Sequence, residues 1–163
     1  MSNIINSKKA ISISAKLKSE GKTIVLAGGC FDILHIGHIK FLEAAKKRGD
    51  VLFILLESDK NVKKIKGNER PINNQKDRAL ILSALKPVDY VVALKEMKTN
   101  SDYDKLILNL KPDIIAATKK SPQIIHNRRQ AKLVNAKIAL VINRISGKST
   151  TGLANIIARD NQL

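Results

Sequence analysis

Two histidines and several glycines lie at the predicted junction between the first strand and the helix that follows it. The junction is the run Gly28-Gly29-Cys30-Phe31-Asp32-Ile33-Leu34-His35-Ile36-Gly37-His38, between the apolar segment Thr23–Ala27 and the amphipathic segment Ile39–Arg48. His35 and His38 are three residues apart, so both imidazoles project to one side of the opening turn and can donate to phosphoryl oxygens. The helix start adds unpaired N–H groups and a positive dipole end. This pattern indicates chemistry on a nucleoside triphosphate.

The glycines favour a functional interpretation of the histidine pair. A histidine pair by itself is more often a surface feature or part of a hydrogen-bonded core. Here it follows Gly28-Gly29 at a strand end, and Gly37 lets a phosphate approach where a Cβ atom would block it. Asp32 either caps the turn or orients a donor, and the residues leave both roles open.

A second candidate phosphate site lies near the end of the sequence. Its Gly147-Lys148-Ser149 segment is not a P-loop, because that motif requires a glycine five residues before Gly147 and position 142 is Ile. Ser149 or Thr150 can begin a last helix as its N-cap. Hydroxyls and amides at a helix start also bind phosphate, so we expect this segment to contribute to the same site.

Two basic segments carry further candidates. Lys63–Pro71 is predicted as a loop after the second strand, where its cations can neutralise a triphosphate or an acceptor phosphate. A solvated charge run is the alternative. Lys119-Lys120 and Arg128-Arg129, with His126 nearby, form another basic stretch, and a solvent-exposed face is the favoured interpretation of the two arginines. No carboxylate pair, Ser-His-Asp set or metal-ligand cluster stands out, so catalysis would depend on positioning and charge stabilisation.

Strand and helix patterns alternate along the chain. Short apolar runs predict strands covered on both faces: Thr23–Ala27, Val51–Glu57, Tyr90–Leu94, Asp113–Ala117 and Lys137–Ile142. Helices are predicted at Ser7–Glu20, Gly37–Arg48, Asn74–Leu85, Asp102–Leu110, Pro122–Val134 and Thr150–Arg159. This order predicts a single α/β domain, residues 21–163, with a Rossmann-like, doubly wound parallel sheet of five strands. Residues 1–20 form a helical lead-in.

Composition limits the class of protein. The 163 residues suffice for one domain, and a hydrophobic content of 44% with a mean hydropathy of -0.13 predicts a soluble globular protein. Apolar runs such as Val51–Leu56 are too short to cross a bilayer. No secretory signal is visible, so a cytoplasmic protein without a membrane partner is expected. A single cysteine, Cys30, excludes an intramolecular disulfide and a cysteine zinc site.

The chain is strongly basic, with 30 Lys and Arg against 14 Asp and Glu and a net charge of +16. Such a field attracts nucleic acids, nucleotides and phosphorylated metabolites alike. Nucleic-acid modules usually combine basic residues with aromatic stacking platforms. This chain has five aromatic residues, and Phe41, Phe53 and Tyr90 fall in apolar segments typical of a core. Nucleic acid is therefore a possible but not a favoured partner.

Together these residues resemble the cytidylyltransferase-like nucleotidyltransferases that carry the His-x-Gly-His motif. The resemblance extends from about Gly21 to Ile157. It looks closest to the adenylyltransferase domain of ADP-heptose synthases, which transfers AMP from ATP to a heptose 1-phosphate. The residues that carry it are Gly29-Cys30-Phe31-Asp32, His35, His38, Glu57-Ser58-Asp59, Lys66-Gly67, Arg70-Pro71-Ile72-Asn73, Arg78, Ala84-Leu85, Val88-Asp89 and Ser149-Thr150-Thr151.

The resemblance implies roles for individual residues. His35 and His38 would stabilise charge on the phosphates, and Lys66 and Arg78 would hold phosphate groups. The implied nucleotide-binding residues are Gly29, Cys30, Phe31, Asp32, Gly37, Arg144, Ser149 and Thr150. Lys64, Arg70 and Lys119 are the implied acceptor-binding residues. The resemblance also implies a homodimer and Mg²⁺ that bridges the phosphate oxygens, because no carboxylate cage is visible.

Two departures from the family pattern keep the base and the acceptor open. The run Ala116-Ala117-Thr118-Lys119-Lys120 stands where the family usually has Gly-Asp or Gly-Gly-Asp, and Ala27-Gly28 stands where the heptose branch has Thr-Asn. A lysine at that place suits a more anionic acceptor. Cytidylyl transfer to glycerol 3-phosphate or another polyol phosphate is one alternative. The other is a nucleotide- or RNA-binding protein that kept the fold and lost turnover.

Overall fold

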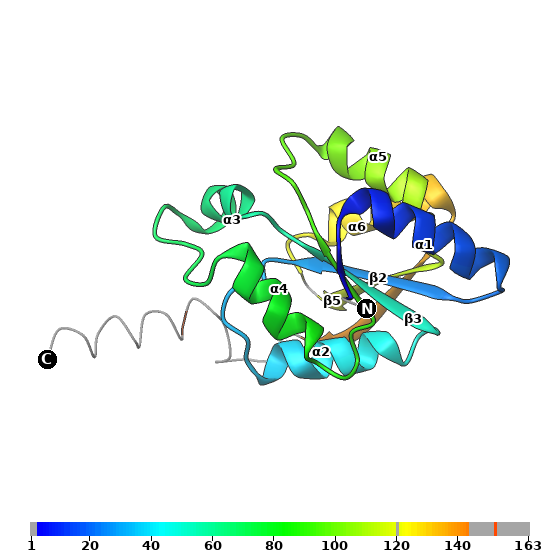
Figure 1. Ribbon diagram of the computed structural model, residues 1–163, viewed down its shortest axis with the longest axis horizontal. Coiled ribbons are helices and arrows are strands. Elements are labelled where there is room, and N and C mark those ends of the chain that lie inside the picture. The colour runs from blue at the N-terminus through cyan, green and yellow to red at the C-terminus, as the bar shows by residue number, and fades with distance from the viewer. Residues whose placement is uncertain (1–2, 120, 144–151, 153–163) are drawn as a thin grey trace, which may run out of the picture.

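The computed structural model describes residues 3–119, 121–143 and 152. Within them, six parallel strands form one sheet in the order β1-β4-β3-β2-β5-β6 (Figure 1). The strands are β1 (Ile4–Ile5), β2 (Ile24–Gly29), β3 (Val51–Leu56), β4 (Tyr90–Ala93), β5 (Ile114–Lys119) and β6 (Lys137–Asn143). The helices are α1 (Ser7–Ser19), α2 (Ile36–Lys46), α3 (Asp59–Lys66), α4 (Gln75–Ser83), α5 (Asn100–Leu110) and α6 (Ile124–Val134).

The predicted doubly wound α/β fold is confirmed, and the five predicted strands correspond to β2 through β6. The structure adds β1, a sixth strand that pairs with β4 at the edge of the sheet. A strand of two residues is too short to make a recognisable apolar run, so the sequence pattern did not indicate it. The predicted last helix, Thr150–Arg159, falls on residues of which only Gly152 is described.

Helices cover both faces of the sheet, with α1, α5 and α6 on one side and α2 and α4 on the other (Figure 1). On one face α2 and α4 pack against Val25 and Ala27 of β2, and on the other face α1 and α5 pack against Ile24 and Leu26. Successive residues of β2 therefore enter two different cores. This is why the strand is apolar without the alternation of a half-exposed strand.

The segment Lys63–Pro71 was predicted as a loop, and this was wrong for its first part. Lys63, Lys64 and Lys66 lie in the last turn of α3. The Ser58 side chain caps this helix by accepting from the Asn61 amide, and Gly67, with φ of +104°, ends it. The helix was not recognised because it is short and its eight residues hold two apolar side chains, Val62 and Ile65, among four lysines, so the segment has the composition of a solvated charge run.

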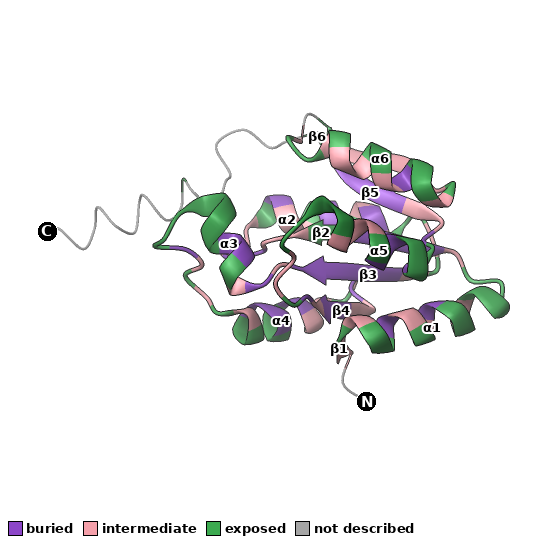
Figure 2. Cartoon of the chain, turned by 90° about the horizontal axis from the view of Figure 1, so that it is seen from above, coloured by how far each residue is buried: buried purple, intermediate pink, exposed green. Residues whose placement is uncertain are grey.

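The strand order reverses at β2, which lies between β3 and β5. The chain leaves β2 toward α2 on one face, whereas the neighbouring β5 continues to α6 on the other (Figure 2). In open α/β sheets the loops after the carboxyl ends of two such strands diverge and leave a crevice between them. The histidine segment follows β2 directly and therefore borders this crevice.

The amino end of β3 depends on a carboxylate. The Asp89 carboxylate accepts a 2.6 Å hydrogen bond from the buried Leu52 amide. It also forms an ion pair with Lys46 at 2.6 Å. We expect Asp89→Ala to lower the free energy of unfolding by about 1–3 kcal/mol, because the Leu52 amide loses its acceptor in the interior. Urea denaturation measures this loss. Asp89→Asn keeps an acceptor oxygen, and a loss equal to that of Asp89→Ala would contradict the assignment to this hydrogen bond.

Candidate active site

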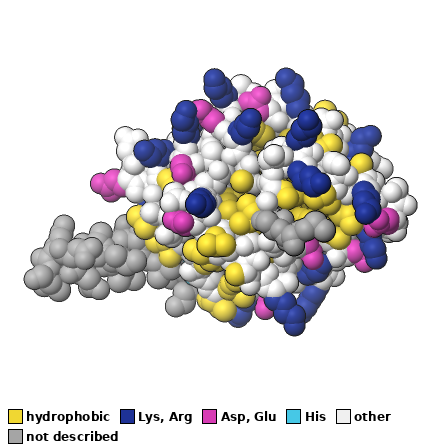
Figure 3. Space-filling view, in the orientation of Figure 1, with side chains coloured by type: hydrophobic (Ala, Val, Ile, Leu, Met, Phe, Trp, Pro, Cys, Tyr) yellow, Lys and Arg dark blue, Asp and Glu magenta, His cyan; other side chains and the backbone are white. Residues whose placement is uncertain are grey.

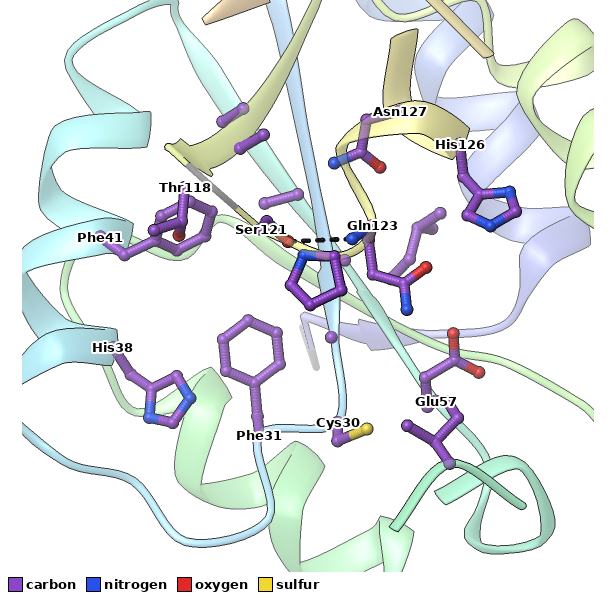
Figure 4. A pocket seen from close by; sticks show the side chains of 18 of the residues that line it. Cys30, Phe31, His38, Phe41, Glu57, Thr118, Ser121, Gln123, His126 and Asn127 are labelled. Carbon is purple, nitrogen blue, oxygen red and sulfur yellow. Dashed lines mark hydrogen bonds between the residues drawn. The ribbon is translucent and has the colours of Figure 1, made fainter. Parts of the chain in front are cut away.

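A cavity of about 610 Å³ opens at the carboxyl ends of β2 and β5 (Figure 4). Its walls come from the loop after β2, the first turn of α2, the end of α3, the start of α5 and the segment from β5 into α6. The cavity thus lies at the switch point of the sheet, between β2 and β5. Among the described residues, it brings together nine of the predicted site residues: Gly29, Cys30, Phe31, Asp32, His35, Gly37, His38, Lys66 and Arg70.

The glycine-rich end of β2 turns sharply into the loop. Phe31 has a positive φ of 45°, and its buried ring lies so close to Gly29 that a Cβ atom there would be 2.9 Å from it. The same ring packs against the His38 imidazole with centroids 5.3 Å apart. Gly29 is therefore required for close packing of the loop, and Phe31 supports one of the two histidines.

The two imidazoles are held by the start of α2. The N-cap residue His35 accepts a 3.1 Å hydrogen bond at Nδ1 from the Gly37 amide, and His38 accepts a 3.3 Å bond at Nδ1 from the His35 amide. The rings lie 4.0 Å apart. Because both Nδ1 atoms are acceptors, this network assigns the proton of each neutral ring to Nε2. Each ring then presents an N–H donor at the cavity.

The surroundings keep His38 neutral. Burial, together with the neighbouring His35 and Lys66, lowers the pKa of His38 to about 4. Burial also lowers the pKa of His35. Near neutral pH the pair therefore acts as two hydrogen-bond donors and not as two cations, and Lys66 supplies the positive charge beside it.

Asp32 and Arg70 hold the loop after β2 in place. Asp32 is 3% exposed and accepts from Arg70 Nε at 2.6 Å and from the Ile72 and Asn73 amides at 2.9 and 3.0 Å. Burial opposes the charged form of Asp32, but hydrogen bonds from Asn73, Ile72 and Arg70 outweigh it and lower the pKa of the carboxyl. Of the two roles left open by the sequence, Asp32 thus orients a donor, the guanidinium of Arg70.

Three predicted site residues lie outside the cavity lining. Arg78 is fully buried on α4, and its guanidinium donates to the backbone oxygens of Asn73, Cys30 and Glu57. Lys64 forms a 2.8 Å ion pair with Glu96 on the surface, and Lys119 is exposed at the end of β5. Arg144, Ser149 and Thr150 lie outside the described residues.

The other walls carry polar residues that were given no role in the site from the sequence. Glu57, which follows β3 and is seen in Figure 4, lines one side together with Tyr103 of α5. The opposite side, from β5 into α6, carries Thr118, Ser121, Gln123, His126, Asn127 and Gln130. The position of Glu57 as the last residue of the second predicted strand was an available signal, because such residues share an edge with the histidines.

The family model described as cytidylyltransferase-like matches residues 26–157. This range contains the strand, the loop and the helix that hold His35 and His38. The chain belongs to the cytidylyltransferase-like family. The resemblance drawn from its motifs is therefore confirmed, and the family accounts for the paired imidazoles at the start of α2.

Curated members of the cytidylyltransferase-like family match most of this chain. Bifunctional protein HldE of Campylobacter fetus subsp. fetus is 42% identical over 156 residues, which are 92% of this chain and 31% of the relative. Bifunctional protein HldE of a Nitratiruptor species is 43% identical over 143 residues, which are 86% of this chain and 29% of the relative. The chain thus spans about a third of the length of the curated relatives it matches.

Solved structures support the same fold. A lipopolysaccharide core biosynthesis protein from Thermoplasma volcanium GSS1 is 33% identical, with a TM-score of 0.58, over 79% of this chain and 100% of that one. A pantoate-beta-alanine ligase from Francisella tularensis superposes with a TM-score of 0.66. The match covers 98% of this chain and 79% of the ligase chain. At 18% identity, this second likeness shows the fold alone.

The neutral state of His38 has a measurable consequence. An unfolded histidine takes up a proton near its ordinary pKa of 6.5, whereas folded His38 does so only at about 4. The unfolded state thus binds more protons between these values, and this histidine makes stability fall as the pH decreases through that range. Nitrogen-15 NMR should show the Nε2–H form of His38 down to about pH 5. A His38 signal that titrates near 6.5 would contradict this geometry.

Proposed function

We propose that this chain is a nucleotidyltransferase that moves a nucleoside monophosphate, with ATP as the expected donor, to a sugar 1-phosphate of the heptose class. The observation that carries the proposal is the pair of fixed Nε2–H donors at the start of α2, beside Lys66, at the switch point of the sheet. The family match and the two HldE relatives support it. The solved relative named for lipopolysaccharide core biosynthesis is consistent with a sugar acceptor.

The reaction needs charge stabilisation more than proton transfer. An acceptor phosphate oxygen attacks the α-phosphorus in line, the bond from that phosphorus to the bridging oxygen breaks, and pyrophosphate leaves with the electron pair. The attacking oxygen is already anionic, so no base has to remove a proton from it. The Nε2–H groups of His35 and His38 would donate to phosphoryl oxygens as negative charge develops on them.

Magnesium enters this proposal as part of the substrate. Within residues 3–119, 121–143 and 152, no group of three or more His, Cys, Asp or Glu side chains is placed to hold a metal ion. Asp32 lines the cavity, but its oxygens already accept from Arg70 and from two backbone amides. Mg²⁺ would therefore arrive on the triphosphate oxygens and reduce their charge there.

The remaining predicted residues take two kinds of role in the proposal. Lys66 would bind phosphate directly, since its side chain lines the cavity. Arg78 would act as a positioning residue, because its donors hold the loop backbone. Phosphate binding by Arg144, Ser149 and Thr150 stays a prediction, as does a homodimer.

A cytoplasmic location, where nucleoside triphosphates are available, is part of the proposal. In the part of the chain that the structure describes, no helix is both long enough and apolar enough to cross a bilayer.

Lys and Arg side chains are spread over the face seen in Figure 3, and do not gather there into one basic patch. This face therefore offers no continuous basic track for a nucleic acid.

The deciding experiment measures pyrophosphate release in the presence of Mg²⁺. Each of the four ribonucleoside triphosphates is offered with heptose 1-phosphate and with glycerol 3-phosphate. We expect release with ATP and heptose 1-phosphate. Release confined to CTP and glycerol 3-phosphate would replace the proposal by cytidylyl transfer. No release from a folded protein with any pair would contradict it and favour a binding role.

The imidazole donors have a direct test. We expect His35→Ala and His38→Ala to lower kcat by about 10²-fold or more, because each removes a donor to the developing charge. His35→Asn and His38→Asn are matched variants: the Asn side chain can still accept from the backbone at the Nδ1 position, but it lacks the Nε2–H group. The Asn variants should retain thermal stability and lose as much turnover as the Ala variants. Unchanged turnover in the Asn variants would disprove the role of the donors.

A further inference from the structure

The cavity carries opposite charges on two of its walls. Lys66 and the start of α2 provide the phosphate-binding side, with His35 and His38. Glu57 follows β3 and extends its carboxyl group into the same cavity (Figure 4). A carboxylate repels phosphate, so this wall suits a part of the ligand that carries hydrogen-bond donors and no phosphate.

Neutral donors hold the Glu57 side chain. The Tyr103 hydroxyl lies 2.9 Å from both carboxylate oxygens, and Asn61 Nδ2 donates to one of them at 3.1 Å. The nearby cation, Arg78, donates instead to the backbone oxygen of Glu57 and to Asp59. The Glu57 carboxylate is therefore fixed by hydrogen bonds from neutral groups, and it forms no ion pair with Arg78.

Burial and hydrogen bonding shift the pKa of the Glu57 carboxyl in opposite directions. Burial raises the pKa of Glu57, and the hydrogen bonds from Tyr103 and Asn61 only partly offset that effect. Burial and the Glu57 charge raise the pKa of Tyr103, so its hydroxyl remains a donor at neutral pH. A carboxylate has about four lone-pair positions, and these two partners leave acceptor capacity that faces the cavity.

We propose that Glu57 determines acceptor specificity by accepting hydrogen bonds from hydroxyl groups of the acceptor sugar, with Tyr103 and Asn61 as positioning residues. This inference rests on the proposed function and deepens it. Sugar hydroxyls are neutral donors, and two of them can bind the two oxygens of one carboxylate. Glu57 precedes α3 and Lys66 ends it, and both line the cavity, so Lys66 is the cation available there for the acceptor phosphate.

The ribose of the nucleotide offers the same hydroxyl chemistry, and the place of Glu57 along the sheet is our reason for assigning it to the acceptor. The nucleotide in a doubly wound sheet lies across the switch point, here between β2 and β5. Glu57 ends β3, on the side of β2 away from β5. A carboxylate at the end of the neighbouring strand binds ribose in dinucleotide-binding sheets, so the Kd of ATP and the Kd of heptose 1-phosphate, measured separately, decide between the two ligands.

The test measures binding directly, so that it does not depend on turnover. Calorimetry gives the Kd of heptose 1-phosphate and the Kd of ATP for the wild-type chain, Glu57→Gln, Tyr103→Phe and Glu20→Gln. Glu57→Gln is isosteric and keeps one acceptor oxygen for Tyr103. Glu20→Gln is the matched control, because Glu20 is an exposed carboxylate at the end of α1. Circular dichroism and thermal melting confirm that each variant folds.

We expect Glu57→Gln to raise the Kd of heptose 1-phosphate by about 10-fold or more, the range lost with a hydrogen bond to a charged group. The Kd of ATP should stay within about twofold, and Tyr103→Phe should raise the Kd of heptose 1-phosphate by a smaller factor. An unchanged Kd for heptose 1-phosphate overturns the inference, and so does a loss confined to ATP or a wild-type chain that binds no heptose 1-phosphate. Weaker binding by Glu57→Gln without pyrophosphate release from the wild type would uphold the inference and disprove the proposed transfer.

Discussion

One buried guanidinium organises the floor of the cavity. Arg78 has no exposed surface, and it donates to backbone oxygens of three separate loops, at Cys30, Glu57 and Asn73. A buried charge is costly unless it is paired and hydrogen-bonded, and here Asp59 supplies the counter-charge at 2.7 Å. Without this side chain, the loops that carry the histidine segment and Glu57 would lose their common donor. The active-site geometry thus depends on a residue that does not line the cavity.

A second arginine completes this arrangement. Arg70 binds Asp32 in the loop after β2, and the amides that follow Arg70 bind the same carboxylate. Together with the bond from Arg78 to Asn73, this ties residues 70–73 to the histidine loop and to α4. Donors fixed in this way before a ligand arrives do not have to be ordered during the reaction, which is the condition for effective charge stabilisation.

The sequence could predict the place of the site but not the role of every residue in it. Apolar runs and a helix start located His35 and His38 correctly, because local periodicity determines both. The family resemblance implied that Arg78 holds phosphate, but a sequence shows only that a cation is present and not where its donors point. The partnership of Glu57 with Tyr103 depends on burial and on a contact across 46 residues. No local pattern encodes such a contact.

The net charge of +16 does not predict which charges line the cavity. Lys119, which stands where the family resemblance implies a carboxylate, is exposed and lies outside the cavity lining, while its neighbour Thr118 lines it. The Lys119 side chain therefore adds its positive charge to the surface and is not one of the described residues that line the cavity. Glu57 does the opposite, since it sets a negative group inside a strongly basic protein. Bulk charge draws phosphorylated ligands to the chain, but the orientation of a ligand in the cavity follows from where individual side chains are held.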